Sequence, residues 1–187
     1  MCEDITNAVK ALREGGVILY PTDTVWGIGC DATNEKAVER IFEIKKRTNA
    51  KALLLLVDSS AKLNYYIEEV PDIAYDLIKL ATKPLTIIYP RARHLAANLL
   101  DEDGSVGIRI TQEAFSRQLC ERFRKPVVST SANISGQATP KIFAEISSEI
   151  IALVDYAVKY RQGDNISAQP SGILKLGQKG EIKIIRK

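Results

Sequence analysis

Apolar residues follow two different spacings along the chain, and the two spacings alternate. Between residues 4 and 14, Ile5, Val9 and Leu12 recur every three or four positions, which is the spacing of one helix face. Two glycines come next, and glycine adopts the positive φ that ends a helix at little cost. Residues 17–20 then form a continuous apolar run, which is typical of a buried strand. The pattern therefore predicts a helix followed directly by a strand.

The rest of the chain repeats this alternation. A second helix starts at Asn34 and places Val38, Ile41 and Ile44 on one face. The other predicted helices span residues 72–81, 113–123 and 141–152, the other predicted strands span residues 53–57, 85–89, 106–110, 127–130, 173–176 and 182–185, and the main expected loops span residues 21–29 and 162–171. Alternating helices and apolar strands predict one α/β domain over residues 1–187 around a largely buried mixed sheet.

Composition limits this picture in three ways. The 187 residues suffice for one domain, and the 45% apolar content can fill one substantial core. A formal charge of +3 is too small to indicate a polyanionic partner by itself. Cys2, Cys30 and Cys120 are odd in number and far apart, which favours reduced thiols over a disulfide framework or a metal site.

No segment resembles a membrane span or a signal peptide. The longest apolar runs fall well short of the roughly 20 residues needed to cross a bilayer. The first residues carry acids where a signal peptide carries basic residues. We therefore expect a cytoplasmic protein without a membrane partner.

Polar residues cluster where the strand over residues 17–20 ends. Open α/β sheets bind ligands at the loops that leave their strands. Thr22 and Thr24 bring two hydroxyls to this position, and Gly27 and Gly29 would let a ligand approach the backbone closely. The alternative is an ordinary turn.

A second candidate is the basic cluster at the end of the second helix. Lys45, Lys46 and Arg47, with Lys51 shortly after, could hold phosphates, and an arginine fork suits two oxygens at once. The same residues could instead form a solvated helix end, where the helix dipole favours cations.

The third and fourth candidates lie on the strands over residues 127–130 and 106–110. The segment 129–136 carries a dense run of hydroxyls, one amide and a glycine, and a helix-capping turn accounts for only one or two of them. Arg109 interrupts an otherwise apolar strand, and a buried arginine needs an anionic partner. That partner is either an internal carboxylate or a carboxylate or phosphate of the substrate.

The motifs of ordinary hydrolases and NTPases are missing. The chain contains no P-loop, no GxSxG elbow and no HExxH motif. Its one histidine, His94, lies in a polar stretch that we interpret as a surface loop, and we assign it no role.

Taken together, these segments resemble the YrdC-like threonylcarbamoyl-AMP synthase family over nearly the entire chain, and they indicate its short, single-domain type. The matching motifs, in one order, are Tyr20-Pro-Thr-Asp-Thr-Val-Trp-Gly-Ile-Gly29, the Lys45-x-Arg47 pair, Val106-Gly-Ile-Arg109 and Ser129-Thr-Ser131-Ala-Asn133-Ile-Ser-Gly136. The Lys-x-Arg and Ser-x-Asn pairs are the enzymatic signature of this family. A related subgroup with a proposed RNA-binding role lacks both pairs.

The resemblance implies a twisted open α/β sheet with helices packed on it and a basic concave surface. It implies a nucleotidyltransferase that binds ATP with Mg²⁺, L-threonine and bicarbonate and releases threonylcarbamoyl-AMP and pyrophosphate. The product would serve a tRNA modification through downstream threonylcarbamoyl-transfer proteins, with tRNA or double-stranded RNA as a further partner. No metal ligand in the protein itself is expected.

The resemblance also implies a role for individual residues. Lys45 and Arg47 would be catalytic, because they can neutralise charge on the phosphates. The residues that would hold threonine are Thr22, Thr24, Arg109 and Ser131, and those that would face the nucleotide are Lys45, Arg47, Lys51, Thr86, Ser129, Asn133 and Ser171. The loop over residues 162–171 could act as a lid that protects labile intermediates from water.

Three segments depart from the common pattern of the family. The sequence has Lys83-Pro84-Leu85 where relatives often have Pro-Gly-Pro, Trp26 in place of Tyr or Phe, and Ser171-Gly172 in place of Ser-Thr. These departures bear on nucleotide contacts near residue 83 and on the C-terminal segment.

Two other functions remain open. The basic concave face could bind double-stranded RNA or tRNA through phosphates without any chemistry, and steep salt dependence would then be expected. Alternatively, the chain could carry out carbamoyl adenylation from carbamoyl phosphate, as in the related domain of hydrogenase-maturation proteins. Those proteins carry acylphosphatase and zinc-finger regions that are missing from this sequence.

Overall fold

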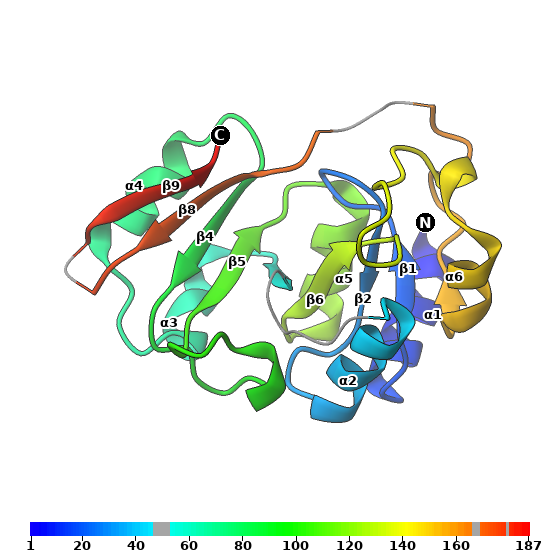
Figure 1. Ribbon diagram of the computed structural model, residues 1–187, viewed down its shortest axis with the longest axis horizontal. Coiled ribbons are helices and arrows are strands. Elements are labelled where there is room, and N and C mark those ends of the chain that lie inside the picture. Colours follow the sequence, from blue (N-terminus) through cyan, green and yellow to red (C-terminus); the bar gives the residue numbers. More distant parts are fainter. Residues whose placement is uncertain (47–52, 166–168, 179) are drawn as a thin grey trace.

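The computed structural model describes residues 1–46, 53–165, 169–178 and 180–187 (Figure 1). The helices are α1 (Cys2–Arg13), α2 (Glu35–Ile44), α3 (Leu63–Tyr66), α4 (Asp72–Leu80), α5 (Ala114–Phe123) and α6 (Ser148–Leu153), with short 3-10 helices η1 (Ser60–Lys62), η2 (Ala97–Leu99) and η3 (Phe143–Glu145). The strands are β1 (Ile18–Tyr20), β2 (Gly27–Gly29), β3 (Leu54–Val57), β4 (Leu85–Tyr89), β5 (Val106–Ile110), β6 (Val127–Ser131), β7 (Tyr156–Ala157), β8 (Gly172–Leu176) and β9 (Ile182–Arg186).

The strands form one mixed sheet in the order β7-β1-β2-β6-β3-β5-β4-β8-β9. The pairs β1/β7, β3/β5 and β4/β8 are parallel, and the remaining neighbours are antiparallel. In Figure 1, α1, α2 and α6 gather at the end of the sheet that carries β1 and β2, whereas α4 lies at the end with β8 and β9. The prediction of an α/β domain with a mixed sheet is confirmed.

Helix α1 ends as its two glycines predict. Gly15 has a φ of 79°, and its N–H donates to the carbonyl of Leu12 at 3.1 Å while the N–H of Gly16 donates to that of Ala11 at 2.8 Å. Two such bonds satisfy carbonyls that a helix otherwise leaves without partners at its C-terminus. The chain can therefore turn at once into β1.

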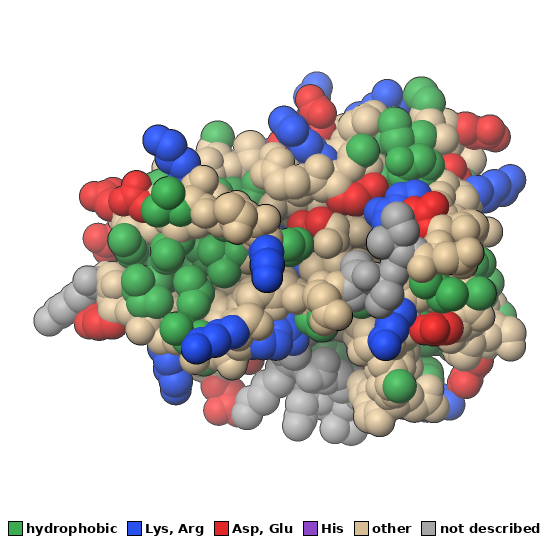
Figure 2. All heavy atoms as spheres, turned by 90° about the horizontal axis from the view of Figure 1, so that it is seen from above, with side chains coloured by type: hydrophobic (Ala, Val, Ile, Leu, Met, Phe, Trp, Pro, Cys, Tyr) green, Lys and Arg blue, Asp and Glu red, His purple; other side chains and the backbone are tan. Residues whose placement is uncertain are grey.

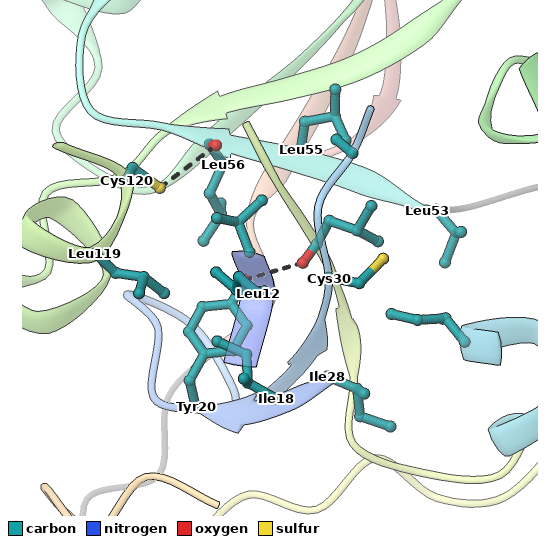
Figure 3. Close-up of a cluster of buried hydrophobic side chains, with 14 of the residues drawn as sticks. Leu12, Ile18, Tyr20, Ile28, Cys30, Leu53, Leu55, Leu56, Leu119 and Cys120 are labelled. Atoms are coloured by element: carbon teal, nitrogen blue, oxygen red, sulfur yellow. Dashed lines mark hydrogen bonds between the residues drawn. The ribbon is translucent and has the colours of Figure 1, made fainter. Parts of the chain in front are cut away.

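The core lies between the sheet and the helices packed on it, and both faces of β3 are covered, since Leu55 and Leu56 are each fully buried. Helix α5 packs against β3, and α1 packs against α5. Figure 3 shows Leu12 of α1, Leu119 of α5 and Leu56 of β3 directed toward one another, and each is at most 1% exposed. Burial of complete leucine side chains contributes roughly 1.5–3 kcal/mol each to folding, so the packed helices hold the central strands in place.

Four elements of the structure differ from the prediction. Residues 27–29, expected in a loop, form β2, because this Gly-Ile-Gly segment pairs with both β1 and β6. Residues 141–152 were expected to form one helix, but α6 begins only at Ser148, since the Ser147 hydroxyl accepts from the N–H of Ile150 and caps the helix there. The short elements α3 and β7 have too few residues to show a periodicity and were not predicted.

The end of the sheet is exposed. Among the described strands, β9 pairs only with β8, and Ile182 and Ile184 are 47% and 58% exposed. Figure 2 shows hydrophobic side chains gathered at this end of the molecule, where Leu80 of α4 is 75% exposed. Among the residues that the structure describes, no helix is long and apolar enough to cross a bilayer.

Candidate active site

A pocket of about 270 Å³ opens on one face of the sheet. The side chains of Ile87 and Ile108 belong to the other face. Alternate residues of a strand point to the same face, and Gly107 and Arg109 of β5 both line this pocket. The residues that line this open-face pocket are Thr24, Val25, Trp26, Gly27, Leu53, Leu54, Thr86, Ile88, Asp101, Gly107, Arg109, Ser129, Thr130, Ser131, Thr139, Pro170, Ser171, Ile173 and Arg186.

The sheet register brings these residues together from distant parts of the chain. Thr86 lies opposite Arg109 on one side and opposite Ile173 on the other. Leu54 pairs with Ser129, and Ser131 pairs with Gly27. A row of cross-strand neighbours therefore forms one continuous surface across β2, β6, β3, β5, β4 and β8.

Two glycines keep the floor of the pocket free of side chains. A Cβ atom on Gly27 would lie 3.1 Å from the Ser129 hydroxyl oxygen, and one on Gly107 would lie 3.3 Å from the Thr86 methyl carbon. Both contacts are tighter than ordinary van der Waals separation. Glycine at these positions leaves room for a ligand above the strands.

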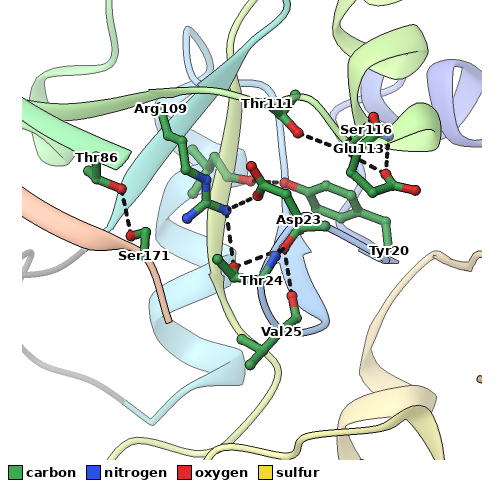
Figure 4. Close-up of polar contacts among 12 residues, drawn as sticks. Tyr20, Asp23, Thr24, Val25, Thr86, Arg109, Thr111, Glu113, Ser116 and Ser171 are labelled. Atoms are coloured by element: carbon green, nitrogen blue, oxygen red, sulfur yellow. Dashed lines mark hydrogen bonds and ion pairs between the residues drawn. The ribbon is translucent and has the colours of Figure 1, made fainter. Parts of the chain in front are cut away.

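Arg109 is the buried cation of the pocket. Its guanidinium is 3% exposed and lies 3.0 Å from a carboxylate oxygen of Asp23, and its Nη2 donates to the Thr24 hydroxyl at 3.2 Å (Figure 4). Its Nε is buried and donates to no described residue. Asp23 is therefore the internal carboxylate that the sequence left open as a partner of Arg109. Arg109 also lines the pocket, where a ligand can reach it.

The Asp23–Arg109 pair is strongly influenced by burial. Burial raises the pKa of the Asp23 carboxyl, and the neighbouring Arg109 charge offsets part of that rise. Burial likewise lowers the pKa of Arg109, and Asp23 opposes this effect. Taking either partner away would leave an uncompensated buried charge.

Thr22 shapes the turn that presents Thr24. The Thr22 hydroxyl accepts from the N–H of Thr24 at 3.0 Å and donates to the carbonyl of Val25 at 2.8 Å. Thr22 is 3% exposed and is not among the residues that line the open-face pocket. It therefore holds the loop that positions Thr24 and Asp23 against Arg109.

Thr86 and Ser171, both predicted to face a nucleotide, meet at one end of the pocket. Their hydroxyl oxygens lie 2.9 Å apart, and both residues are buried (Figure 4). The carbonyl of Ser171 accepts from Nε of Arg186 at 2.8 Å. These bonds join β4, β9 and the segment before β8 along the rim.

Lys45 reaches the end of β6 from the end of α2. Its ammonium donates to the carbonyls of Ser131 at 2.6 Å and of Asn133 at 2.7 Å, and its own carbonyl accepts from the N–H of Ser135 at 3.0 Å. Lys45 is only 2% exposed. The structure thus joins the lysine of one predicted motif to the serine and asparagine of the other, although Lys45 itself does not line the pocket.

Asn133 closes the turn that follows β6. Its amide nitrogen donates to the carbonyls of Ile134 at 3.1 Å and Gln137 at 2.8 Å. Its Oδ1 is buried and accepts from no described residue. Ser129 and Ser131 line the pocket, whereas Asn133 lies just beyond it.

Two predicted residues lie outside the described part of the chain. These are Arg47 and Lys51, within the segment 47–52 that connects Lys46 to Leu53. Leu53 lines the open-face pocket. Of the expected loop over residues 162–171, Pro170 and Ser171 line the pocket, and residues 166–168 lie outside the described part.

Sequence reasoning assigned no site role to several pocket residues. Trp26, Asp101, Thr139 and Arg186 all line the pocket, and Trp26 packs against Phe143 with ring centroids 4.9 Å apart. Asp101, Thr139 and Arg186 lie outside the polar runs that end the central strands. Trp26 lies within one such run, but the sequence indicates only that it replaces the Tyr or Phe common in the family. Arg186 reaches the pocket because β9 pairs with β8, whereas Trp26, Asp101 and Thr139 lie outside the helices and strands. A single sequence reveals neither placement.

The pocket suits a polar, anionic ligand. Its described lining combines the guanidinium groups of Arg109 and Arg186 with several hydroxyls, against the single carboxylate of Asp101. Within the described ranges, no group of three or more His, Cys, Asp or Glu side chains is arranged to hold a metal ion. The groups present can bind carboxylate and phosphate oxygens, and they include no serine–histidine nucleophile.

Comparisons with known proteins agree with this fold over nearly the whole chain. The family model Sua5_yciO_yrdC, described as telomere recombination, matches residues 10–187. A relative from Pseudoalteromonas translucida, named threonylcarbamoyl-AMP synthase, is 37% identical over 172 residues, which cover 90% of this chain and 91% of the relative. The crystal structure of E. coli YciO matches with a TM-score of 0.86 at 25% identity, over 100% of this chain and 90% of that one.

A structure with a bound amino acid is also similar. P. abyssi Sua5 complexed with L-threonine matches with a TM-score of 0.81 at 27% identity. The match covers 92% of this chain and 50% of that one, so this chain spans about half the length of that protein.

Proposed function

The chain belongs to the family of Sua5, YciO and YrdC proteins, and from this membership and the open-face pocket we propose that it is a threonylcarbamoyl-AMP synthase. It is a nucleotidyltransferase whose substrates are L-threonine, bicarbonate and ATP. Its products are threonylcarbamoyl-AMP and pyrophosphate. The adenylate supplies the threonylcarbamoyl modification of the tRNA adenosine next to the anticodon, through downstream transfer proteins.

One observation carries the proposal. The Thr24 hydroxyl and the buried Arg109 guanidinium lie 3.2 Å apart in a pocket that Ser131 also lines, and Lys45 is bonded to the Ser131 carbonyl. Hydroxyls and a guanidinium fork are the groups that bind the hydroxyl and carboxylate of threonine. A Sua5 relative that binds L-threonine supports this assignment.

The reaction needs no nucleophile from the protein. The amine of threonine adds to the carbon of bicarbonate, and loss of water leaves a carbamate. A carbamate oxygen then attacks the α-phosphorus of ATP, the bond from that phosphorus to the β-phosphate bridging oxygen breaks, and pyrophosphate leaves. The protein has to align two anions and balance the charge of the leaving phosphates.

The residues of the pocket divide this work. Arg109, held by Asp23, and Thr24 would orient threonine, with Ser131 beside them. Thr86, Ser129 and Ser171 offer hydroxyls to the nucleotide, and Arg186 adds a cation at the rim. Lys45 and Asn133 hold the turn after β6, so their contribution to the ATP site includes positioning Ser131.

Mg²⁺ enters this site as part of its complex with ATP. Mg²⁺ in nucleotide sites is held mainly by phosphate oxygens and water, with one or two carboxylates. The described lining offers the Asp101 carboxylate for this purpose. The scarcity of other carboxylates fits a metal that arrives on the substrate.

Arg47→Ala is expected to slow pyrophosphate release about a hundredfold or more at saturating substrates. In other enzymes, loss of one preorganised hydrogen-bond donor to a developing charge costs roughly 2–4 kcal/mol of transition-state stabilisation. The measurement is kcat for threonine-dependent pyrophosphate release, with Arg40→Ala as the matched control, since Arg40 pairs with Asp155 away from the pocket. Turnover near that of the wild type would remove Arg47 from the proposed role.

Thr24→Ala and Ser131→Ala are expected to raise KM for L-threonine roughly tenfold or more and to leave KM for ATP nearly unchanged. A hydrogen bond is worth about 0.5–1.5 kcal/mol, or about 1.5–3 kcal/mol where one partner is charged, and a site built around a hydroxyl discriminates strongly against analogues that lack it. Thr6→Ala is the matched control, because Thr6 is exposed on α1. An equal rise in both KM values would contradict the division of the pocket.

The decisive assay is pyrophosphate release from ATP with and without L-threonine and bicarbonate, followed by mass identification of the adenylate. The proposal requires release to depend on both small molecules. Release supported by carbamoyl phosphate in place of bicarbonate and threonine would favour the alternative adenylation, and absence of any release would favour a binding module.

A further inference from the structure

A second pocket combines exposed aromatic rings with cations. It has a volume of about 640 Å³ and is lined by Thr33, Lys62, Tyr65, Tyr66, His94, Arg124 and Lys125. We refer to these residues as the aromatic groove. It shares no lining residue with the open-face pocket, and the proposed reaction uses none of its side chains.

The flat surface of the groove is the ring of Tyr65. This ring stacks on His94 with centroids 4.6 Å apart and planes inclined by 24°. The ring of Tyr66 contacts it nearly at a right angle, with centroids 5.0 Å apart and an angle of 84° between the planes. Tyr65 nevertheless remains 60% exposed. A ring that is held by two neighbours and still faces solvent can stack on a planar ligand without losing much side-chain freedom.

The backbone around the groove adopts an unusual conformation at two of its residues. His94 has a φ of 57° and Arg124 a φ of 66°. Arg124 is the left-handed C-cap residue that ends α5, and helices commonly end in this way, whereas the φ of His94 is adopted at a cost by a residue other than glycine. Both side chains line the same groove.

The cations of the groove differ in how they are neutralised. Lys125 donates to a carboxylate oxygen of Asp31 at 2.6 Å, and Lys62 is bound to Asp58. The Arg124 guanidinium makes no hydrogen bond or ion pair with any residue in the described ranges. The groove thus offers the unpaired guanidinium of Arg124 beside the ring of Tyr65. Its two lysines, Lys62 and Lys125, are already paired with carboxylates.

We propose that the aromatic groove binds an unpaired nucleotide of single-stranded RNA, with the base stacked on Tyr65 and the adjoining phosphate on Arg124. Stacking on an aromatic ring combined with contacts to phosphate is how proteins hold single strands without reading their sequence. In a duplex the base faces are covered by neighbouring pairs, so this groove favours an unpaired segment. A free nucleotide would be buried too little for tight binding, because enclosed sites cover most of a small ligand.

The test is a fluorescence anisotropy titration of the complete chain with a labelled single-stranded RNA of twelve nucleotides, at several salt concentrations. Tyr65→Ala is expected to weaken binding about tenfold, whereas Tyr65→Phe, which keeps the ring, should bind as the wild type does. Arg124→Gly removes the guanidinium at a backbone position that glycine tolerates. It should lower the slope of log affinity against log salt by about 0.7, which corresponds to one phosphate contact on a single strand.

Matched controls separate the groove from general charge. Arg117→Ala removes one exposed cation from α5 outside the groove and should leave affinity and salt slope unchanged. A duplex of the same sequence should bind more weakly, and AMP should compete only at much higher concentration. Wild-type binding by both Tyr65→Ala and Arg124→Gly, or tighter binding of the duplex or of AMP, would overturn the proposal.

The outcome is independent of the proposed enzyme reaction. Tyr65→Ala should keep threonine-dependent pyrophosphate release at the wild-type rate, since Tyr65 lies in a different pocket. Loss of RNA binding with retained release would locate the site in the groove.

Discussion

Arg109→Ala will reduce kcat/KM for L-threonine by about a hundredfold or more and will lower the free energy of unfolding by about 3–5 kcal/mol. The first effect follows because a buried, hydrogen-bonded charge that faces a ligand carboxylate is worth roughly 2–5 kcal/mol when it is removed. The second follows because Asp23, 3.0 Å from the guanidinium, would remain as an unpaired charge in the interior. Urea unfolding and threonine-dependent pyrophosphate release measure the two effects.

The double variant Asp23→Ala/Arg109→Ala separates folding from substrate binding. It removes both charges together, so most of the lost stability should return. Its use of threonine should remain as poor as that of Arg109→Ala, because the guanidinium is still missing. A stable double variant with normal threonine kinetics would show that Arg109 serves only the fold.

Gly29→Ala will destabilise the protein by about 3 kcal/mol or more. A Cβ atom at this position would lie 2.2 Å from the Val128 carbonyl oxygen and 2.7 Å from a ring carbon of Tyr20. Neither neighbour can move easily, since both belong to the buried sheet, and overpacking of a well-filled core commonly costs 1–3 kcal/mol even where some adjustment is possible. The measurement is the urea midpoint or the melting temperature.

Gly163→Ala is the matched control for this substitution. A Cβ atom on Gly163 would meet nothing within 4 Å. The variant should keep the wild-type stability or gain slightly, because alanine restricts the unfolded chain. Equal stability of both variants would contradict the packing described around Gly29.

The alternation of helices and strands could be predicted because most elements leave a repeated pattern. Strand β3 is a continuous apolar run, β4 and β5 are mostly apolar, β6 begins with two valines, and α1, α2 and α5 carry regular apolar faces. β2 could not be predicted in this way, because Gly27 and Gly29 contribute no side chains and its stability comes from pairing with β1 and β6. The short distances around Gly29 show that it serves close packing between Tyr20 and β6, in contrast to the expected approach of a ligand.

The candidate site was predicted in part. Polar residues at strand ends, such as Thr24, Ser129 and Ser131, do line the pocket. Residues that reach it through pairing of distant strands, such as Arg186, leave no local signal in the sequence. Asp23 lies within a motif of the sequence, but its role could not be predicted, because its contact with Arg109 joins segments 86 residues apart in the sequence.

Contact between two sequence motifs is the part of the site that physical chemistry explains best. A lysine that is 2% exposed must be hydrogen-bonded to be tolerated in the interior. Lys45 meets this requirement with the carbonyls of Ser131 and Asn133. The basic end of α2 is therefore tied to the polar end of β6, which brings the predicted catalytic and substrate-binding segments to one place.

A crystal structure of the protein with L-threonine and a non-hydrolysable ATP analogue tests the central claim most directly. The account predicts both ligands in the open-face pocket, with the threonine carboxylate on Arg109, its hydroxyl near Thr24 or Ser131, and the phosphates toward the rim at Ser171 and Arg186. Threonine or nucleotide bound only outside this pocket, with Arg109 still closed on Asp23 alone, would contradict it.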